Sequence, residues 1–135
     1  AGLVPDARST TIFALVAALG RKDRVRALEL LDALIREGEY LPLALNFLAI
    51  QFRQALVARE AGLKSAPQIQ AHFSKLGVPM WPARAQQVFQ TVTAFSPEQL
   101  SLAITSIFEA DRNLRDFRPD DRVVLEAFVL RLTGE

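Results

Sequence analysis

Apolar residues recur every three to four positions along almost the whole chain, which is the period of an amphipathic α-helix. Breaks in this pattern fall mostly at glycines and prolines. The pattern predicts seven helices, at residues 10–19, 23–37, 41–61, 66–76, 82–94, 97–116 and 120–132. No segment shows the strict alternation of a half-buried β-strand. We therefore predict an all-α fold, a single-domain helical bundle of about six to seven helices.

Local signals indicate where these helices begin and end. A left-handed C-terminal cap is favoured after four of the periodic segments, at Gly20, Gly38, Gly62 and Gly77. Residues that can open a helix stand before four of them: Ser9 or Thr10, Asp23, Ser96, and the run Arg118-Pro119-Asp120.

The helix predicted at residues 41–61 is apolar on two faces, which is typical of the central helix of a bundle. Its two stripes are Leu45, Leu48, Phe52 and Leu56, and Leu43, Phe47 and Ile50. The predicted core faces of two other helices are Val25, Leu28, Leu31 and Ile35, and Leu100, Ile104, Ile107 and Leu114.

Composition argues against most kinds of catalytic site. The 135 residues are 50% hydrophobic and 23% charged, which is a globular profile, and the formal net charge of +1 points to neither nucleic acid nor membrane. The absence of cysteine excludes disulfides and thiolate metal sites. His72 is the only histidine and there is no cysteine to share a metal with it, so we expect a partly exposed helical residue rather than a member of a triad or a zinc site. We predict no catalytic residue, no metal and no cofactor.

Two features bear on the setting of this chain. We expect it to be part of a longer protein and to lie outside the membrane. Arg53, Arg59 and Glu60 interrupt the most apolar stretch, so we expect no membrane span, which needs roughly 18 apolar residues. The chain begins at Ala1 without a signal peptide or an initiator methionine. We expect residues 1–9 to be a residual linker from an upstream domain and residues 10–135 to be the helical domain, in the cytoplasm.

Three charged residues stand beside apolar faces. Asp111 falls on the apolar stripe of the helix predicted at residues 97–116, and Arg115 follows one turn later, where an ion pair can form. Arg53 lies next to Phe52. Each is either a rim residue of the bundle or a polar group of an interface with another subunit.

Residues 66–92 have the rhythm of a helix-turn-helix, but the second helix carries a single cation, Arg84, and phosphate binding needs several. Trp81, between two prolines, and Phe117 are aromatic residues in turns. Such a ring either stacks on an unpaired base or folds onto the core.

Short motifs occur along nearly the whole chain in a definite order. They are Phe13-x-Leu15-Val16-x-Ala18-Leu19-Gly20-Arg21, Arg26-Ala27-Leu28-x-Leu30-Leu31, Glu37-Gly38-Glu39, Leu48-Ala49-x-Gln51-Phe52-Arg53, Leu76-Gly77-Val78, Ala83-Arg84, Phe95-Ser96-x-Glu98-Gln99-Leu100, Glu109-Ala110-Asp111-x-x-Leu114-Arg115, Leu125-Glu126 and Leu130-x-Leu132. Their joint order and spacing resemble the C-terminal domain of the delta subunit of bacterial DNA polymerase III, with Arg115 in place of the usual lysine.

The resemblance implies a non-catalytic collar domain in an AAA+ related clamp loader, a part of the DNA polymerase III holoenzyme. The collar would assemble with gamma/tau and delta-prime subunits, while the sliding clamp would be contacted only through an N-terminal domain that is not in this sequence. In this family, collar aromatics lie near the single-stranded template, which suggests Trp81 and Phe117 as contacts, with Arg84 nearby. The alternatives are a free-standing α-helical protein-interaction module and a helix-turn-helix regulator.

Overall fold

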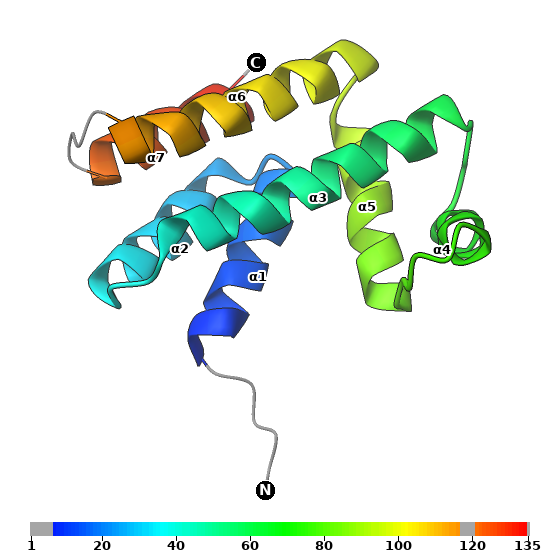
Figure 1. Cartoon of the computed structure of the whole chain (residues 1–135), viewed down its shortest axis with the longest axis horizontal. Helices are drawn as coiled ribbons and strands as arrows, with labels where there is room; N and C mark the ends of the chain where they lie inside the picture. The colour runs from blue at the N-terminus through cyan, green and yellow to red at the C-terminus, as the bar shows by residue number, and fades with distance from the viewer. Residues whose placement is uncertain (1–6, 117–120, 135) are drawn as a thin grey trace, which may run out of the picture.

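The computed structural model describes residues 7–116 and 121–134, and side chains from residue 11 onward except that of residue 116. Within this part of the chain there are seven α-helices and no β-strand (Figure 1). The helices are α1 Ala7–Gly20, α2 Arg24–Arg36, α3 Leu41–Glu60, α4 Ala66–Lys75, α5 Pro82–Ala94, α6 Pro97–Asp116 and α7 Asp121–Thr133. The predicted fold class is confirmed, and each helix lies within a few residues of its predicted range.

Helix α3 runs through the middle of the molecule and packs against α1, α5 and α6 (Figure 1). Helices α6 and α7 lie side by side, and α2 packs against α1 and α7. Helix α4 packs chiefly on α5, at the far end of α3. The first stripe of α3 supplies the core, where Phe52 is fully buried and meets the Phe95 ring edge-on at 4.9 Å. Burial of one such large side chain contributes roughly 1.5–3 kcal/mol.

Two predicted apolar faces differ from the structure. In α3 the second stripe is largely at the surface, because Leu43 and Ile50 are exposed. In α2 the predicted residue Val25 is 70% exposed. The buried residues of α2 are Ala27, Leu30, Leu31 and Leu34. Val25 and Leu34 are nine residues apart, which puts them on opposite sides of a helix with about 3.6 residues per turn.

Most of the predicted caps are confirmed. Asp23 accepts a hydrogen bond from the Arg26 backbone N–H at 3.2 Å. The Ser96 hydroxyl accepts from the Gln99 N–H at 3.1 Å, and the Ser96 N–H donates to Gln99 Oε1 at 2.9 Å, which is a reciprocal capping box. The predicted left-handed glycines have φ of +71°, +70° and +79° at Gly38, Gly62 and Gly77. Arg118, Pro119 and Asp120 lie outside the described residues.

Two predicted helix ends are wrong. Helix α1 begins at Ala7, so Ser9 and Thr10 lie inside its first turn rather than at the cap. Gly20 is not left-handed; in that turn the residue with positive φ is Lys22, at 60°. Gly20 instead ends α1 against two buried polar side chains. A Cβ at this position would overlap Gln51 Nε2 and come within 2.6 Å of Thr91 Oγ1.

Helix α3 is long and apolar enough, by length and composition alone, to cross a membrane, with a window of mean hydropathy 1.3. The prediction that its charges rule this out is wrong, because an 18-residue window with at most two charged residues fits within it. Half of that window is buried among the other helices, as expected for the core helix of a bundle.

Candidate protein interface and nucleic-acid contact

The three charged residues predicted at a rim or an interface line one groove. It runs between the N-terminal half of α3 and the C-terminal half of α6, and it has a volume of about 310 Å³. Arg53, Asp111 and Arg115 line it together with Tyr40, Leu43 and Phe108. The fold therefore brings into one place residues that the sequence offered separately.

Asp111 and Arg115 form the predicted ion pair, with 3.0 Å between Arg115 Nη2 and Asp111 Oδ2. The carboxylate is the more buried partner, with 27% of its side chain exposed, whereas the arginine is mostly in solvent. An exposed pair of this kind contributes roughly 0–1 kcal/mol to stability. Both charges of this pair therefore remain accessible to a binding partner at the edge of the groove.

Arg53 lies over the ring of Phe108, with 5.2 Å between the guanidinium carbon and the ring centroid. This is a cation–π contact between α3 and α6. Phe108 is 51% exposed although it stands beside the buried Ile107. Phe108 was not among the predicted site residues, because its only signal in the sequence is a large aromatic side chain next to the core stripe of its helix.

An apolar surface extends from one side of the groove across α3 to α1. The Phe13 and Phe47 rings lie 5.2 Å apart at 51°, which joins α1 to the outer stripe of α3. We call this surface the α3 face; it comprises Phe13, Tyr40, Leu43, Phe47, Ile50 and Phe108. Contiguous apolar surface of this kind marks interaction sites on soluble proteins more often than single exposed residues do.

Trp81 is 77% exposed in the turn before α5, while its neighbour Met80 is buried. The ring of Trp81 therefore does not fold onto the core, which was one of the two predicted alternatives, and it is free to stack on a base. Leu76 and Val78 in the same turn are exposed too. Phe117, the second predicted aromatic contact, lies outside the described residues.

Arg84 is turned toward α3 and is partly buried. Its Nε donates to Gln54 Oε1 at 3.4 Å, and burial lowers the pKa of its guanidinium. An arginine remains charged at neutral pH in spite of such a shift. Because Arg84 is the single cation of α5, this helix is poorly suited to hold a DNA backbone as a recognition helix does.

The described residues offer contact surfaces rather than reactive groups. Across residues 7–116 and 121–134, no group of three or more histidine, aspartate or glutamate residues is placed to hold a metal ion. His72, partly exposed on α4, has its ring 5.6 Å from that of Phe73. Fold and candidate site together define an all-α bundle whose functional side chains are suited to binding.

Comparison with known proteins gives the family. The chain belongs to the C-terminal domains of the DNA polymerase III delta subunit, because the model of that family matches residues 9–132. This family is non-catalytic, and the chain is accordingly not an enzyme.

One solved structure similar to the chain is that of the Bacillus subtilis DNA clamp loader delta protein (YqeN). The two share 26% sequence identity and superpose with a TM-score of 0.73 over 98% of this chain. The match spans only 38% of the Bacillus protein. No curated protein matches the sequence.

Proposed function

We propose that this chain is the collar of a clamp-loader delta subunit, which assembles with gamma/tau and delta-prime subunits. The assembled loader would place the sliding clamp on primed DNA during replication, in the cytoplasm. The clamp itself would be contacted through another domain of the delta subunit. Residues 10–135 would form the collar domain and residues 1–9 its linker; the family match begins near this boundary, at residue 9, while α1 itself begins at Ala7.

The α3 face is the observation that carries this proposal. Stable protein interfaces have an apolar, well-packed centre and a polar rim. The α3 face offers exposed aromatic and aliphatic side chains at its centre, and Arg53, Asp111 and Arg115 at its edge. Arginine and aromatic residues are enriched among those that dominate binding energy. We infer that the stacked Arg53 and Phe108 are the anchor of the subunit contact.

The exposed ring of Trp81 supports a second contact of the same assembly. Single-stranded nucleic acid binds by stacking its bases on exposed aromatic rings, independently of sequence. Trp81 offers such a ring in a turn whose backbone is held between α4 and α5. We propose that it contacts the template strand in the loader, with Phe117 as a further candidate.

Truncation of the anchor tests the assembly. The variant Phe108→Ala, in the full-length delta subunit, should bind the other loader subunits at least tenfold more weakly, because an interface hot spot contributes about 2 kcal/mol or more. Because Phe108 is half exposed, the variant should keep its helical circular dichroism. Light scattering of the mixed subunits reports the assembled mass.

The matched control is Val25→Ala, which trims an apolar side chain that is 70% exposed on α2, away from the α3 face. It should assemble as the unmodified subunit does. Equal assembly by Phe108→Ala and Arg53→Ala would exclude the α3 face as the interface. Failure of the unmodified subunit to bind these partners at all would instead favour a free-standing interaction module.

A further inference from the structure

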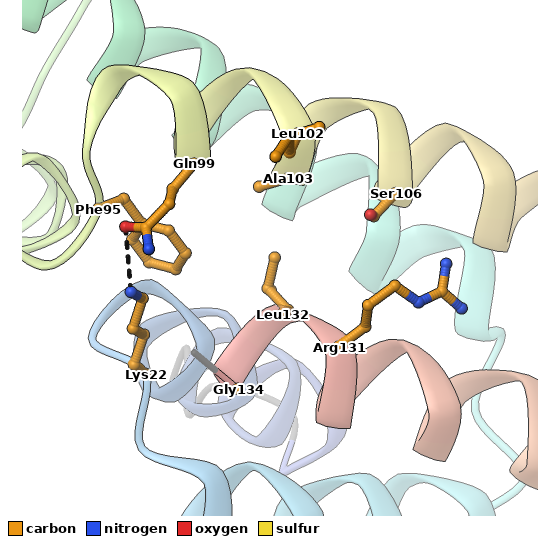
Figure 2. Close-up of a pocket in the computed structure, with 9 residues that line it drawn as sticks. All are labelled: Lys22, Phe95, Gln99, Leu102, Ala103, Ser106, Arg131, Leu132 and Gly134. Carbon is orange, nitrogen blue, oxygen red and sulfur yellow. Dashed lines mark hydrogen bonds between the residues drawn. The ribbon is translucent and has the colours of Figure 1, made fainter.

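A pocket of about 240 Å³ opens between the α1–α2 turn, α6 and the C-terminal end of α7 (Figure 2). Its principal walls are Lys22, Phe95, Gln99, Leu102, Arg131 and Leu132. None of these belongs to the α3 face. We propose that the pocket binds an acidic peptide segment of another protein, which seats an apolar side chain between α6 and α7 and a carboxylate beside Lys22.

Lys22 is held with its ammonium group at the pocket. Its Nζ donates to Gln99 Oε1 at 3.2 Å and lies 4.6 Å from the centroid of the Phe95 ring (Figure 2). Gln99 is itself fixed by the capping box, through the Ser96 N–H. These partners carry no negative charge, and an ammonium has three donors. A ligand carboxylate would therefore find a pre-positioned cation.

The backbone of Lys22 also points to binding. Its φ of 60° is in the left-handed region, where glycine and asparagine are favoured and another side chain strains the backbone. A lysine at such a position weakens the turn and adds a charge at the edge of the pocket. Strained residues of this kind cluster at functional sites, ligand-binding sites among them.

A second cation stands on the opposite wall. Arg131 reaches Glu109 at 4.0 Å, which is at the outer limit of an ion pair, and both side chains are about half exposed. Figure 2 shows Arg131 projecting from α7 beside the pocket. Lys22 and Arg131 give the pocket a positive rim. Charge complementarity therefore favours an acidic ligand.

The interior of the pocket is suited to an apolar side chain of the ligand. Leu102 is 66% exposed at the rim, and Leu132 points from α7 toward Ala103 on α6. The volume is below the roughly 300–1,000 Å³ of small-molecule sites, so it suits one or two side chains of a peptide. A nucleic acid is disfavoured, because Phe95 is the one aromatic among the described residues that line the pocket and its ring is buried, which leaves no exposed ring there for a base to stack on.

The binding experiment uses the 135-residue chain, whose seven helices share a hydrophobic core. The probe is the acetylated, amidated hexapeptide Glu-Asp-Leu-Leu-Glu-Asp. Added to the ¹⁵N-labelled chain, it should shift the amide resonances of Gln99, Leu102 and Arg131 in a saturable way. Two matched peptides, Lys-Lys-Leu-Leu-Lys-Lys and Glu-Asp-Gly-Gly-Glu-Asp, should each bind at least tenfold more weakly.

Two variants separate binding from folding. Lys22→Gly removes the cation and suits the left-handed backbone. Its melting temperature should be no lower than that of the original chain, whereas its affinity for the peptide should be about tenfold lower. Leu102→Glu places a repelling charge on an exposed position and should abolish binding. The matched controls, Lys75→Gln and Leu76→Glu, alter exposed residues near the α4–α5 turn and should bind normally.

Several results would overturn the proposal. They are equal affinity of the chain for the three peptides, unchanged affinity of Lys22→Gly for the acidic peptide, and no shift of the amide resonances at millimolar peptide. Tighter binding of a ten-nucleotide thymidine strand at the same amides would assign the pocket to nucleic acid instead. The proposal stands on the pocket alone and does not depend on the collar function.

Discussion

Gly20, at the end of α1, lies directly against a side chain of α3 and a side chain of α5. The buried amide of Gln51, on α3, donates to the Val16 carbonyl on α1 at 3.4 Å and to the Thr91 hydroxyl on α5 at 3.1 Å. Gln51 and Thr91 are both fully buried. Only a residue without a side chain leaves room for this polar cluster at the end of α1. Gly20 is thus required for packing, although its position in the sequence suggested a cap.

The variant Gly20→Ala should destabilise the fold. The new methyl group would displace the Gln51 amide, and overpacking together with lost buried hydrogen bonds costs about 2–4 kcal/mol. Urea unfolding followed by circular dichroism measures the free energy of unfolding. The double variant Gly20→Ala, Gln51→Ala should be less destabilised than the sum of the two single variants. A loss below about 0.5 kcal/mol for Gly20→Ala would mean that Gln51 has space to move.

Residue contacts within one helical turn were predictable from the sequence, and those between helices were not. The Asp23 cap and the Asp111–Arg115 pair follow from spacings of three and four residues. The packing of Gly20 on Gln51, by contrast, joins residues 31 positions apart. Such a contact depends on how helices cross, which no local pattern contains.

At the scale of helices, periodicity predicted all seven but not always the face that each one buries. In α2, the predicted face favoured the larger apolar side chains, whereas the structure buries Ala27 and leaves Val25 exposed. A small residue permits close approach to a neighbouring helix and so can lie at the centre of a contact. The direction of burial depends on the neighbours of α2, which are α1 and α7.

An ion-pair network joins α2 to α7. Arg122 on α7 lies 2.8 Å from Asp32 on α2 and 3.6 Å from Glu126, and Arg36 reaches the same Asp32 at 2.9 Å. The hydrogen bond from Arg122, with the positive charges of both arginines, holds the pKa of the Asp32 carboxyl below its usual range. The folded state therefore favours the ionised carboxylate more than the unfolded chain does.

This shift predicts a pH dependence. The network stabilises the fold fully above the unfolded pKa of about 3.9, and the contribution is lost as the pH falls through the lower folded pKa. Asp32→Asn should therefore lower the melting temperature at pH 6, and the difference from the original chain should shrink below about pH 4. Thermal unfolding from pH 6 to pH 2.5 measures this.

Glu29→Gln is the matched control for the α2–α7 network, because Glu29 pairs with Arg26 within α2 at 3.6 Å and joins no second helix. Its effect at pH 6 should be smaller than that of Asp32→Asn. A deficit in Asp32→Asn that stays constant down to pH 2.5 would show that the carboxylate charge is not what stabilises the α2–α7 contact.

For the molecule as a whole, the fold assembled a surface that the sequence could only suggest. Arg53 and Asp111 were each predicted as rim or interface residues on separate helices, and the packing of α3 on α6 places them in one groove. The aromatic centre of that surface was missed, because exposure of Phe108 and Phe13 follows from the three-dimensional arrangement. Family motifs, rather than surface chemistry, predicted the family to which the chain belongs.

The template contact proposed for Trp81 is tested in the assembled loader, where the exposed ring would meet the single-stranded template. Stacking of one base on an aromatic ring contributes about 1–3 kcal/mol, so Trp81→Ala should weaken primer–template binding by the loader at least fivefold. Fluorescence anisotropy with a labelled template measures this affinity. Leu76→Ala, in the same exposed turn, is the control and should bind normally. Unchanged affinity in a correctly assembled Trp81→Ala loader would exclude this ring from the template path, while the contribution of the α3 face to assembly would stand.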